Sequence, residues 1–245
     1  MPEGALNRTA DAIPCLVKSV LDERSAGTPV VTVSWAQSQQ GAIAPAGGTR
    51  ATLSSPESMA LTHRLRSLHG AILVGIGTVL ADDPLLTVRL VRGPSPQPVV
   101  LDSFLRIPDH ASLLLRADRA PWIFHALGAP ARRAQELADC GARLFALAAR
   151  EGGLPLEEVL RVLGRHGIES LMVEGGARVL RSFMSRRLAH QAVITVSPVK
   201  MEGLRIFEEG KKPPEFAQTT QAECGPDTVI WGRFEKHQDG LSEHG

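Results

Sequence analysis

The sequence contains no long apolar run and no cluster of cysteines. No segment approaches the ~20 apolar residues that a membrane-spanning helix requires, and the N-terminus has no basic segment followed by an apolar run. Cys15, Cys140 and Cys224 lie far apart and form no Cys-x-x-Cys pair. We therefore expect no membrane insertion, no secretion, no metal site and no disulfide framework, and a reducing, cytoplasmic location.

The sequence also lacks an excess of charge of one sign. Its 27 Lys and Arg residues balance 26 Asp and Glu residues, which leaves a net charge of +1 with the basic residues dispersed. No continuous basic face is predicted, so we expect no nucleic-acid partner and no anionic membrane surface as a partner. Individual arginines could still bind small anionic ligands.

Several common catalytic motifs are missing. The sequence has no Gly-x-x-x-x-Gly-Lys loop, no Gly-x-Ser-x-Gly turn, no His-Glu-x-x-His helix and no Gly-x-Gly-x-x-Gly turn. These absences argue against ATP hydrolysis, a serine hydrolase and a zinc protease. A dinucleotide, if bound, would not be bound in the Rossmann manner.

Apolar runs typical of strands alternate with helical patterns from residue 29 onward. The strand-like runs are 30–35, 71–74, 98–101, 121–125, 142–147, 168–173 and 192–196, with a last strand at 227–235. The helical patterns are 55–68, where Ser55 caps and Pro56 begins the helix, and 130–139, 156–165 and 177–188. The alternation predicts an α/β fold with a mostly parallel central sheet flanked by helices, and the pattern after residue 192 predicts an antiparallel C-terminal edge.

The sequence shows no internal repeat and no change of composition, so we expect a single domain at 29–236. Residues 1–28 are polar and irregular apart from a short helix expected at 13–23. We interpret this segment as an N-terminal extension or linker, either a junction to a partner domain or a dimer-contact arm. Residues 237–245 are predicted to be a polar tail.

The residues that follow the strand-like run 71–74 are the most informative chemically. Gly75 and Gly77 let the backbone come close to a ligand, and the polar side chains of Thr78 and Asp82 follow at once. We predict a ligand-binding loop here. An ordinary junction between a strand and a loop is the alternative.

A second glycine-rich turn, Glu174-Gly175-Gly176-Ala177, lies between a predicted strand and a predicted helix. Free backbone amides at a helix N-terminus attract anions, and glycine lets a phosphate approach the backbone. We therefore predict an anion site at this turn. A carboxylate stabilised by the helix dipole alone is the alternative interpretation of Glu174.

Three segments together resemble the reductase of riboflavin biosynthesis. They are 71–89, with Gly-Ile-Gly-Thr-Val-Leu-Ala-Asp-Asp-Pro and then Leu-Thr-Val-Arg, 98–108, with Leu-Asp-Ser-Phe-Leu-Arg-Ile-Pro, and 171–180, with Val-Glu-Gly-Gly-Ala-Arg-Val-Leu. They occur in the family's order, and the resemblance covers about residues 29–234. It implies a fold like that of dihydrofolate reductase, NADPH as the cofactor, and reduction of a ribosylamino-pyrimidine phosphate to its ribitylamino form.

The resemblance also implies roles for individual residues. The cofactor-binding positions are Ala36, Gly75, Gly77, Thr78, Asp82, Ser103, Gly175, Gly176, Ala177, Arg178, Val179 and Leu180. The substrate-binding positions are Arg66, Leu86, Arg89 and Glu174, and the two guanidinium groups suit a sugar phosphate. The proton donor is either Asp82, which would have to be buried to hold its proton near neutral pH, or solvent. A structural turn is the alternative for Ser103, and a solvated surface position is the alternative for the arginines.

The first strand departs from the family pattern. Gln39 and Gln40 stand where the family usually has Leu and Asp, and Ser34 stands where bacterial bifunctional members tend to have Lys. Gln40 cannot ionise, so any role that needs a carboxylate there is lost. Archaeal and fungal-type members of the family also lack the Lys.

The zinc deaminase signature, His-x-Glu with Pro-Cys-x-x-Cys, is absent, so the resemblance implies a stand-alone reductase. It would deliver hydride from NADPH to C1′ of the ring-opened ribosylamine. A 2,5-diamino-pyrimidinone and the deaminated uracil both fit as substrates, and the missing Lys favours the first. Two alternatives stay open: a related reductase that acts on another pterin or pyrimidine, and a non-catalytic nucleotide-binding subunit. The family usually dimerises, so we expect a homodimer.

Overall fold

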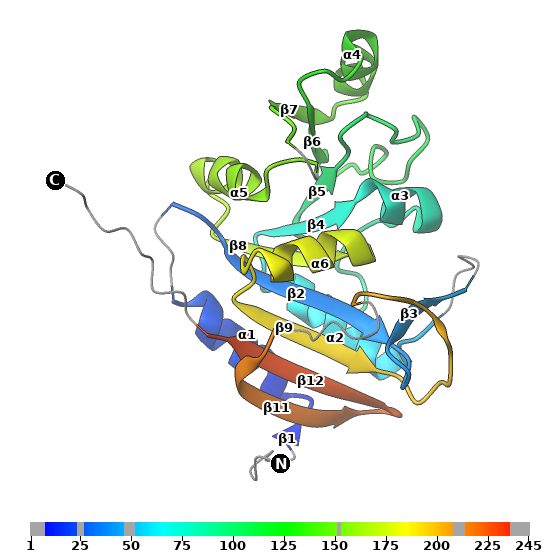
Figure 1. Ribbon diagram of the computed structural model, residues 1–245, viewed down its shortest axis with the longest axis vertical. Helices are drawn as coiled ribbons and strands as arrows, with labels where there is room; N and C mark the ends of the chain where they lie inside the picture. Colours follow the sequence, from blue (N-terminus) through cyan, green and yellow to red (C-terminus); the bar gives the residue numbers. More distant parts are fainter. Residues whose placement is uncertain (1–7, 24–26, 47–51, 151–152, 208–213, 236–245) are drawn as a thin grey trace, which may run out of the picture.

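The computed structural model describes residues 8–23, 27–46, 52–150, 153–207 and 214–235. Its strands form a ten-stranded sheet in the order β1-β11-β12-β9-β2-β8-β4-β5-β6-β7 and a separate pair, β3 and β10 (Figure 1). The strands are β1 Arg8–Thr9, β2 Val30–Gln37, β3 Ala42–Pro45, β4 Ala71–Gly75, β5 Gln97–Leu101, β6 Trp122–Ala126, β7 Arg143–Leu147, β8 Ser170–Gly175, β9 Gln191–Val196, β10 Gly203–Arg205, β11 Phe216–Cys224 and β12 Asp227–Phe234. The helices are α1 Ala12–Leu21, α2 Pro56–Arg66, α3 Ile76–Asp82, α4 Ala131–Asp139, α5 Leu156–Arg165 and α6 Ala177–Ser185.

The strands from β9 to β7 in this order pair in parallel, whereas β12 and β11 pair antiparallel at one side. This arrangement confirms the predicted α/β fold with a parallel centre and an antiparallel C-terminal edge. Every residue of β4 is buried. Central parallel strands are covered on both faces, and for this reason β4 is a continuous apolar run rather than an alternating one.

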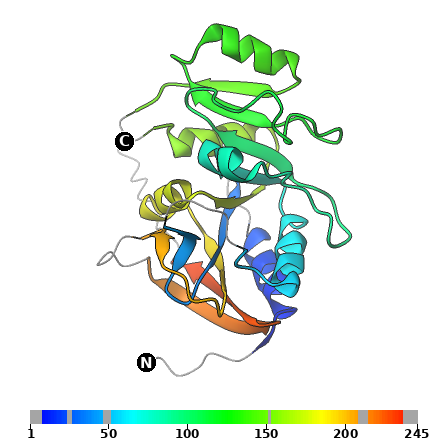
Figure 2. The same cartoon turned by 90° about the vertical axis from the view of Figure 1, so that its right-hand side faces the viewer.

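Helices cover both faces of the sheet (Figure 2). Leu73 of β4 belongs to the core cluster under α5 and α6, whereas its neighbour Ile72 belongs to the cluster under α3 and α4. Met172 of β8 belongs to a third cluster, under α1 and α2. Since adjacent strand residues point to opposite faces, α5 and α6 lie on one face and the other four helices on the opposite face.

The N-terminal segment, expected to be an extension or linker, contributes a helix to the core. Ile13 and Val17 of α1 are fully buried in the cluster that also holds Leu65 of α2. The buried side-chain amide of Gln191 donates to the carbonyl oxygen of Val17 at 3.2 Å. The part of the segment that forms α1 is therefore packed against the sheet, and the helix expected at 13–23 occurs at Ala12–Leu21.

Two segments differ from the predicted elements. The predicted loop after β4 is a helix, α3, in which Ile76 and Val79 are buried on one side; Asp83, with φ of 40°, ends it just before Pro84. The glycines of this segment obscured its helical spacing. Residues 216–224 form one long strand, β11, where short strands and loops were expected, because β11 pairs along the whole of β12.

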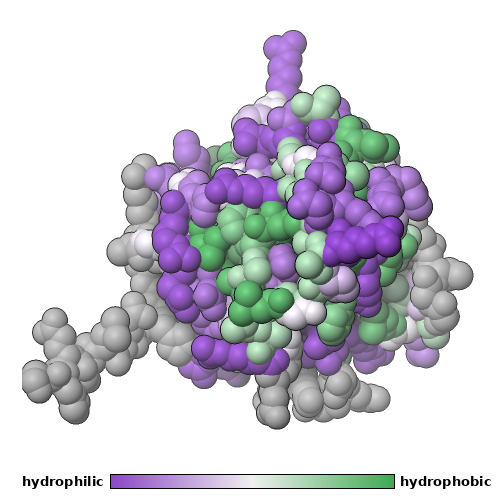
Figure 3. Space-filling view, turned by 90° about the horizontal axis from the view of Figure 1, so that it is seen from above, coloured by the Kyte–Doolittle hydropathy of each residue, from purple (hydrophilic) through white to green (hydrophobic). Residues whose placement is uncertain are grey.

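The surface at one end of the molecule is partly apolar. Figure 3 looks onto the end formed by α4, β6 and β7, where hydrophobic side chains gather in the middle of the face and hydrophilic ones surround them. Large exposed apolar side chains of the chain include Phe104, Leu115 and Leu127. None of the helices in the described ranges is both long and apolar enough to cross a membrane.

A buried chain of polar side chains links α2 to the sheet. His69 Nδ1 lies 2.7 Å from the carbonyl oxygen of Leu65, so this nitrogen carries the proton, and Nε2 accepts from the Thr32 hydroxyl at 2.8 Å. Thr32 Oγ1 accepts in turn from Gln191 Nε2 at 3.0 Å, and Gln191 Oε1 accepts from Trp231 at 2.8 Å. Burial lowers the pKa of His69 from 6.5 to about 4, and the network holds the imidazole neutral.

We expect the stability of the protein to fall as the pH drops from about 6.5 to about 4. In this window the unfolded chain takes up a proton at His69, whereas the folded chain does not. A depression of that size corresponds to about 3 kcal/mol of unfolding free energy, present above pH 6.5 and lost on acidification. The unfolding free energies of wild type and His69→Gln can be measured by urea unfolding at several pH values in this range. The unfolding free energy of the variant should fall less steeply with decreasing pH than that of wild type. His110→Gln, at an exposed position, is the control, and an unchanged slope in His69→Gln would contradict the assignment.

Candidate functional site

Strands β4 and β8 are neighbours, but the chain leaves their carboxyl ends in opposite directions. From β4 it continues through α3 to β5 on one side, and from β8 it continues through α6 to β9 on the other. A sheet that is divided in this way has a crevice outside the carboxyl ends of the two strands, and α/β proteins bind ligands there. The two glycine-rich turns singled out in the sequence lie at this position.

The two turns are in direct contact. The Gly176 amide donates to Thr78 Oγ1 at 2.9 Å. A β-carbon at Gly175 would lie 2.7 Å from Thr78 Oγ1, and one at Gly75 would lie 2.8 Å from a methyl group of Val179. Glycine is therefore required at both positions for the close approach of the two strands and the helices that follow them.

A cavity of about 540 Å³ opens between these turns and the ends of β5, β6 and β7. Seven residues that the sequence assigned to a cofactor line it: Gly75, Gly77, Thr78, Ser103, Gly176, Arg178 and Val179. Five others do not: Ala36 lies near the end of β2, Gly175 is buried at the end of β8, Ala177 and Leu180 belong to the core, and Asp82 is exposed at the end of α3.

Sequence reasoning missed several residues of this cavity, above all Arg106, Arg150 and Arg186. Arg106 lies in the quoted segment 98–108, so the resemblance did mark its neighbourhood. Arg150 and Arg186 carry no local signal, because each reaches the cavity only through the folding of distant segments. The assembled wall is strongly cationic and suits an anionic ligand.

The N-terminus of α6 faces the same cavity. Gly176 precedes the helix with φ of 30°, and this N-cap residue has no side chain that could bond to the first turn. The first amides of a helix have no partner within it and carry part of the helix dipole, so they favour an anion. This geometry supports the predicted anion site at the glycine-rich turn.

Glu174 projects from an irregularity in the sheet. Leu73 of β4 pairs with Val173, but the next residue, Val74, pairs with Gly175, so Glu174 is an extra residue between the two pairs. Such a bulge changes the direction of a side chain, and bulges often occur beside active sites. Here it allows the carboxylate to reach Arg66 of α2.

Arg66 and Glu174 form a two-pronged ion pair. Arg66 Nε donates to Glu174 Oε1 at 2.7 Å, and Nη2 donates to Oε2 at 2.6 Å; both side chains are nearly buried. Nη1 of the same arginine donates to the carbonyl oxygen of Thr87 at 3.1 Å. Burial alone would lower the pKa of Arg66, but the charge and hydrogen bonds of Glu174 raise it above its usual value. Two of the four residues assigned to the substrate thus lie together, and the carboxylate is held by an arginine rather than by the helix dipole alone.

Arg89 lies beside this pair and rests on a buried histidine. Its backbone amide donates to His63 Nδ1 at 3.0 Å, and its side chain donates to Thr87 Oγ1 at 3.2 Å. His63 is therefore neutral with its proton on Nε2, and burial, assisted by Arg66 and Arg89, lowers its pKa to about 4. His63 is thus a buried support for the Arg89 segment.

Three other residues singled out in the sequence are Leu86, Asp82 and Gln40. Leu86 is 2% exposed, with φ of 52°, and its side chain packs in the core rather than toward a ligand. Asp82 is exposed at the end of α3. Gln40 Oε1 accepts from the Met201 amide at 2.9 Å, so this side chain supports the loop after β9.

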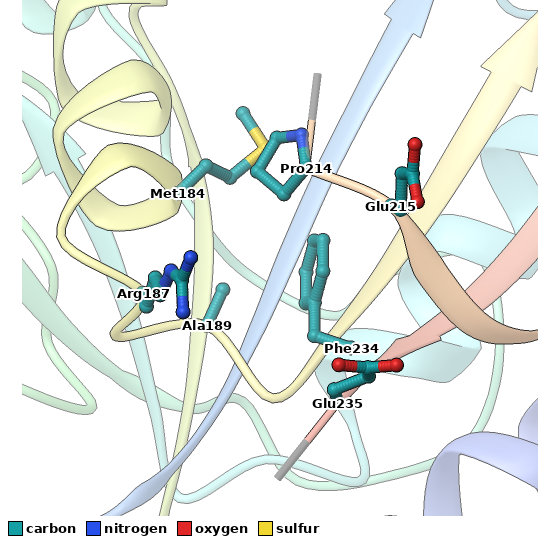
Figure 4. Close-up of a pocket in the computed structure, with 7 residues that line it drawn as sticks. All are labelled: Met184, Arg187, Ala189, Pro214, Glu215, Phe234 and Glu235. Carbon is teal, nitrogen blue, oxygen red and sulfur yellow. The ribbon is translucent and has the colours of Figure 1, made fainter. Parts of the chain in front are cut away.

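A second cavity, of about 350 Å³, lies between the end of α6 and the start of β11 (Figure 4). Its lining residues are Met184, Arg187, Ala189, Pro214, Glu215, Phe234 and Glu235. None of them was predicted to belong to a site. Two carboxylates and one guanidinium give this cavity no cationic character comparable with that of the first.

The chain is similar to known proteins over most of its length. The family model of the RibD C-terminal domain matches residues 29–230. The riboflavin biosynthesis protein RibD of Bacillus amyloliquefaciens is 32% identical over 92% of this chain, and the match spans only 62% of that longer relative. The 2,5-diamino-6-ribosylamino-4(3H)-pyrimidinone 5′-phosphate reductases of Eremothecium gossypii and Methanothermobacter thermautotrophicus are 35% and 34% identical, over 86% and 82% of this chain and 91% and 96% of theirs.

Solved structures show the same fold. Acinetobacter baumannii RibD superposes with a TM-score of 0.76 at 24% identity, over 92% of this chain and 64% of its own. The riboflavin biosynthesis reductase Rib7 of Saccharomyces cerevisiae superposes with a TM-score of 0.74 at 22% identity, over 91% of this chain and the whole of its own.

We expect Glu174→Gln to destabilise the protein by about 3–5 kcal/mol, because it leaves the buried Arg66 charge without its partner. Urea unfolding measures the change. Glu136→Gln is the matched control: it breaks ion pairs with Arg132 and Arg133 at the surface, where water screens the charges, and should cost far less. Equal losses of unfolding free energy in the two variants would show that the Arg66–Glu174 pair contributes no more to stability than a surface ion pair.

Proposed function

The chain belongs to the RibD C-terminal domain family, and we propose that it is a reductase of riboflavin biosynthesis that uses NADPH to convert a ribosylamino-pyrimidine 5′-phosphate to the ribitylamino form. One observation carries the proposal: the cationic cavity at the β4 and β8 turns adjoins the Arg66–Glu174 pair, because Gly176 of the cavity wall lies two residues after Glu174. A dinucleotide in the cavity and a substrate at the ion pair would therefore meet at the ends of these strands.

The residues of the cavity fit NADPH. The amides at the start of α6 and the hydroxyl of Thr78 surround a place where glycine lets a pyrophosphate approach the backbone. When bound, NADPH supplies the hydride for reduction of a carbon–nitrogen double bond. The chain itself holds the two reactants in contact.

The substrate side offers two separate kinds of contact. Arg89 is exposed and anchored through its backbone to His63, so its guanidinium is available for a 5′-phosphate. Glu174 is fixed by Arg66 and can accept hydrogen bonds from amino groups of a pyrimidine or hydroxyl groups of a sugar chain through its remaining lone pairs. Reduction at C1′ of the ring-opened imine would leave the nitrogen to take a proton from solvent, and Asp82, the other candidate donor, is exposed at the end of α3.

We propose the 2,5-diamino-pyrimidinone as the substrate rather than the deaminated uracil. Two relatives whose names state that substrate are 35% and 34% identical to this chain. Ser34, in place of the Lys of the bifunctional proteins, agrees with this choice.

Purified protein should oxidise NADPH with the 2,5-diamino substrate faster than with the deaminated uracil, measured by the loss of NADPH absorbance. Gln40→Asp should change the rate by no more than about threefold, because Gln40 supports a loop through its carbonyl oxygen and an Asp side chain is one methylene shorter but also accepts. Oxidation only with the uracil would overturn the substrate choice. Oxidation with neither substrate would overturn the reductase proposal, and turnover appearing only in Gln40→Asp would indicate a repurposed or inactive relative.

A further inference from the structure

The wall of the 540 Å³ cavity carries positive side chains in addition to the helix N-terminus that is proposed to bind the pyrophosphate. Four of its described lining residues are arginines: Arg106, Arg150, Arg178 and Arg186. No described lining residue is acidic. The whole chain has a net charge of only +1. In Rossmann folds an acidic side chain holds the ribose 2′-hydroxyl of NAD, whereas an arginine accommodates the 2′-phosphate of NADP, and the same charge argument applies to a dinucleotide site on another fold. The local composition is that of a site for the phosphorylated dinucleotide.

The position of the adenosine follows from the order of the strands, and this step rests on the proposed function. The reacting end of the dinucleotide must lie beside the Arg66–Glu174 pair at the end of β8. From there the cavity extends along the ends of β4, β5, β6 and β7, past Ser103, Ala126 and Ala149. The adenosine end therefore lies toward β5 to β7, where the turn after β5 brings Arg106 into the wall.

The turn that carries Arg106 is held at several points. The Asp102 carboxylate accepts from the Ile107 amide at 2.9 Å, and the Leu105 amide donates to the Asp102 carbonyl oxygen at 3.2 Å. The Ser103 carbonyl oxygen accepts from the Ala126 amide at 3.1 Å, which ties the turn to the end of β6. Leu105 has φ of 55° and is buried. Arg106 therefore projects from a fixed turn rather than from a mobile loop.

The Arg106 side chain lies beside Asp102 and Phe104, but its N–H groups make no hydrogen bond to them. Asp102 is fully buried, and its second oxygen lies 3.7 Å from Arg106 Nε, an electrostatic contact that is too long for a hydrogen bond. The guanidinium stands 6.0 Å from the centre of the Phe104 ring, and 54% of the side chain is exposed. Arg106 makes no side-chain hydrogen bond within the described residues, so its guanidinium fork is free to bind a phosphate on two oxygens.

We propose that Arg106 binds the 2′-phosphate of the cofactor, oriented by Asp102, and thereby makes the protein select NADPH over NADH. Phe104, which is 66% exposed beside it and lines the same cavity, offers an apolar surface for the adenine.

The test compares 2′,5′-ADP with ADP, two probes that lack the nicotinamide and differ in the position of one phosphate. Binding is measured by calorimetry for wild type and Arg106→Ala, together with NADPH and NADH. The variant should bind 2′,5′-ADP and NADPH about 10- to 100-fold more weakly, and ADP and NADH within about threefold of wild type, because a two-pronged arginine contact to phosphate is lost. Arg132→Ala, which removes an equally charged but 92% exposed side chain on α4, should keep the wild-type preference.

Arg186→Ala separates position from general charge, because Arg186 lines the same cavity from the end of α6 and pairs with Glu157. An equal loss of the 2′,5′-ADP preference in this variant, or no loss in Arg106→Ala, would overturn the proposal, as would a wild-type protein that binds neither adenine nucleotide. The outcome is independent of turnover. A protein that reduces neither pyrimidine would contradict the proposed function, whereas the preference for 2′,5′-ADP would still decide the role of Arg106.

Discussion

The close approach of the turns after β4 and β8 is the constraint on which the rest of the site depends. Glycine at 75 and 175 leaves room for Val179 and Thr78, and the hydroxyl of Thr78 accepts the amide of Gly176. A side chain at either glycine would push the two strand ends apart. The contact is possible because β4 and β8 are parallel neighbours whose helices leave in opposite directions, which is also the reason that a crevice opens above them.

Charge divides this crevice into two regions. On the β8 side, Arg66 and Glu174 neutralise each other through two short hydrogen bonds, so a buried arginine and a buried carboxylate are kept in one geometry. On the side of β5 to β7, arginines line the wall with no acidic side chain among the described lining residues. The first region is suited to orienting a neutral, hydrogen-bonding group, and the second to binding a highly charged anion. A nicotinamide dinucleotide that reacts with a pyrimidine needs both.

Much of this structure could be predicted from the sequence. The apolar runs of the parallel strands, the Ser55-Pro56 helix start and the Glu-Gly-Gly turn each carry a local signal, and the corresponding elements occur where they were expected. The features that escaped prediction depend on contacts between distant residues. Glu174 reaches Arg66, 108 positions away, only because of a bulge that no local pattern reveals.

The other differences between the sequence prediction and the structure also depend on contacts between distant residues. The burial of Leu86 and the exposure of Asp82 are set by the way α3 packs, and the glycines of that helix concealed it. Arg150 and Arg186 enter the cavity from segments that no motif marks. The local sequence around a single arginine does not predict whether the side chain binds an anion, because the strand order determines its surroundings.

A crystal structure of the chain with bound NADPH would test the central claim most directly. The account predicts the pyrophosphate at the backbone amides of the first turn of α6, with the nicotinamide ring directed toward Glu174. Density for the cofactor in the cavity between α6 and β11, or a nicotinamide directed away from the Arg66–Glu174 pair, would contradict it.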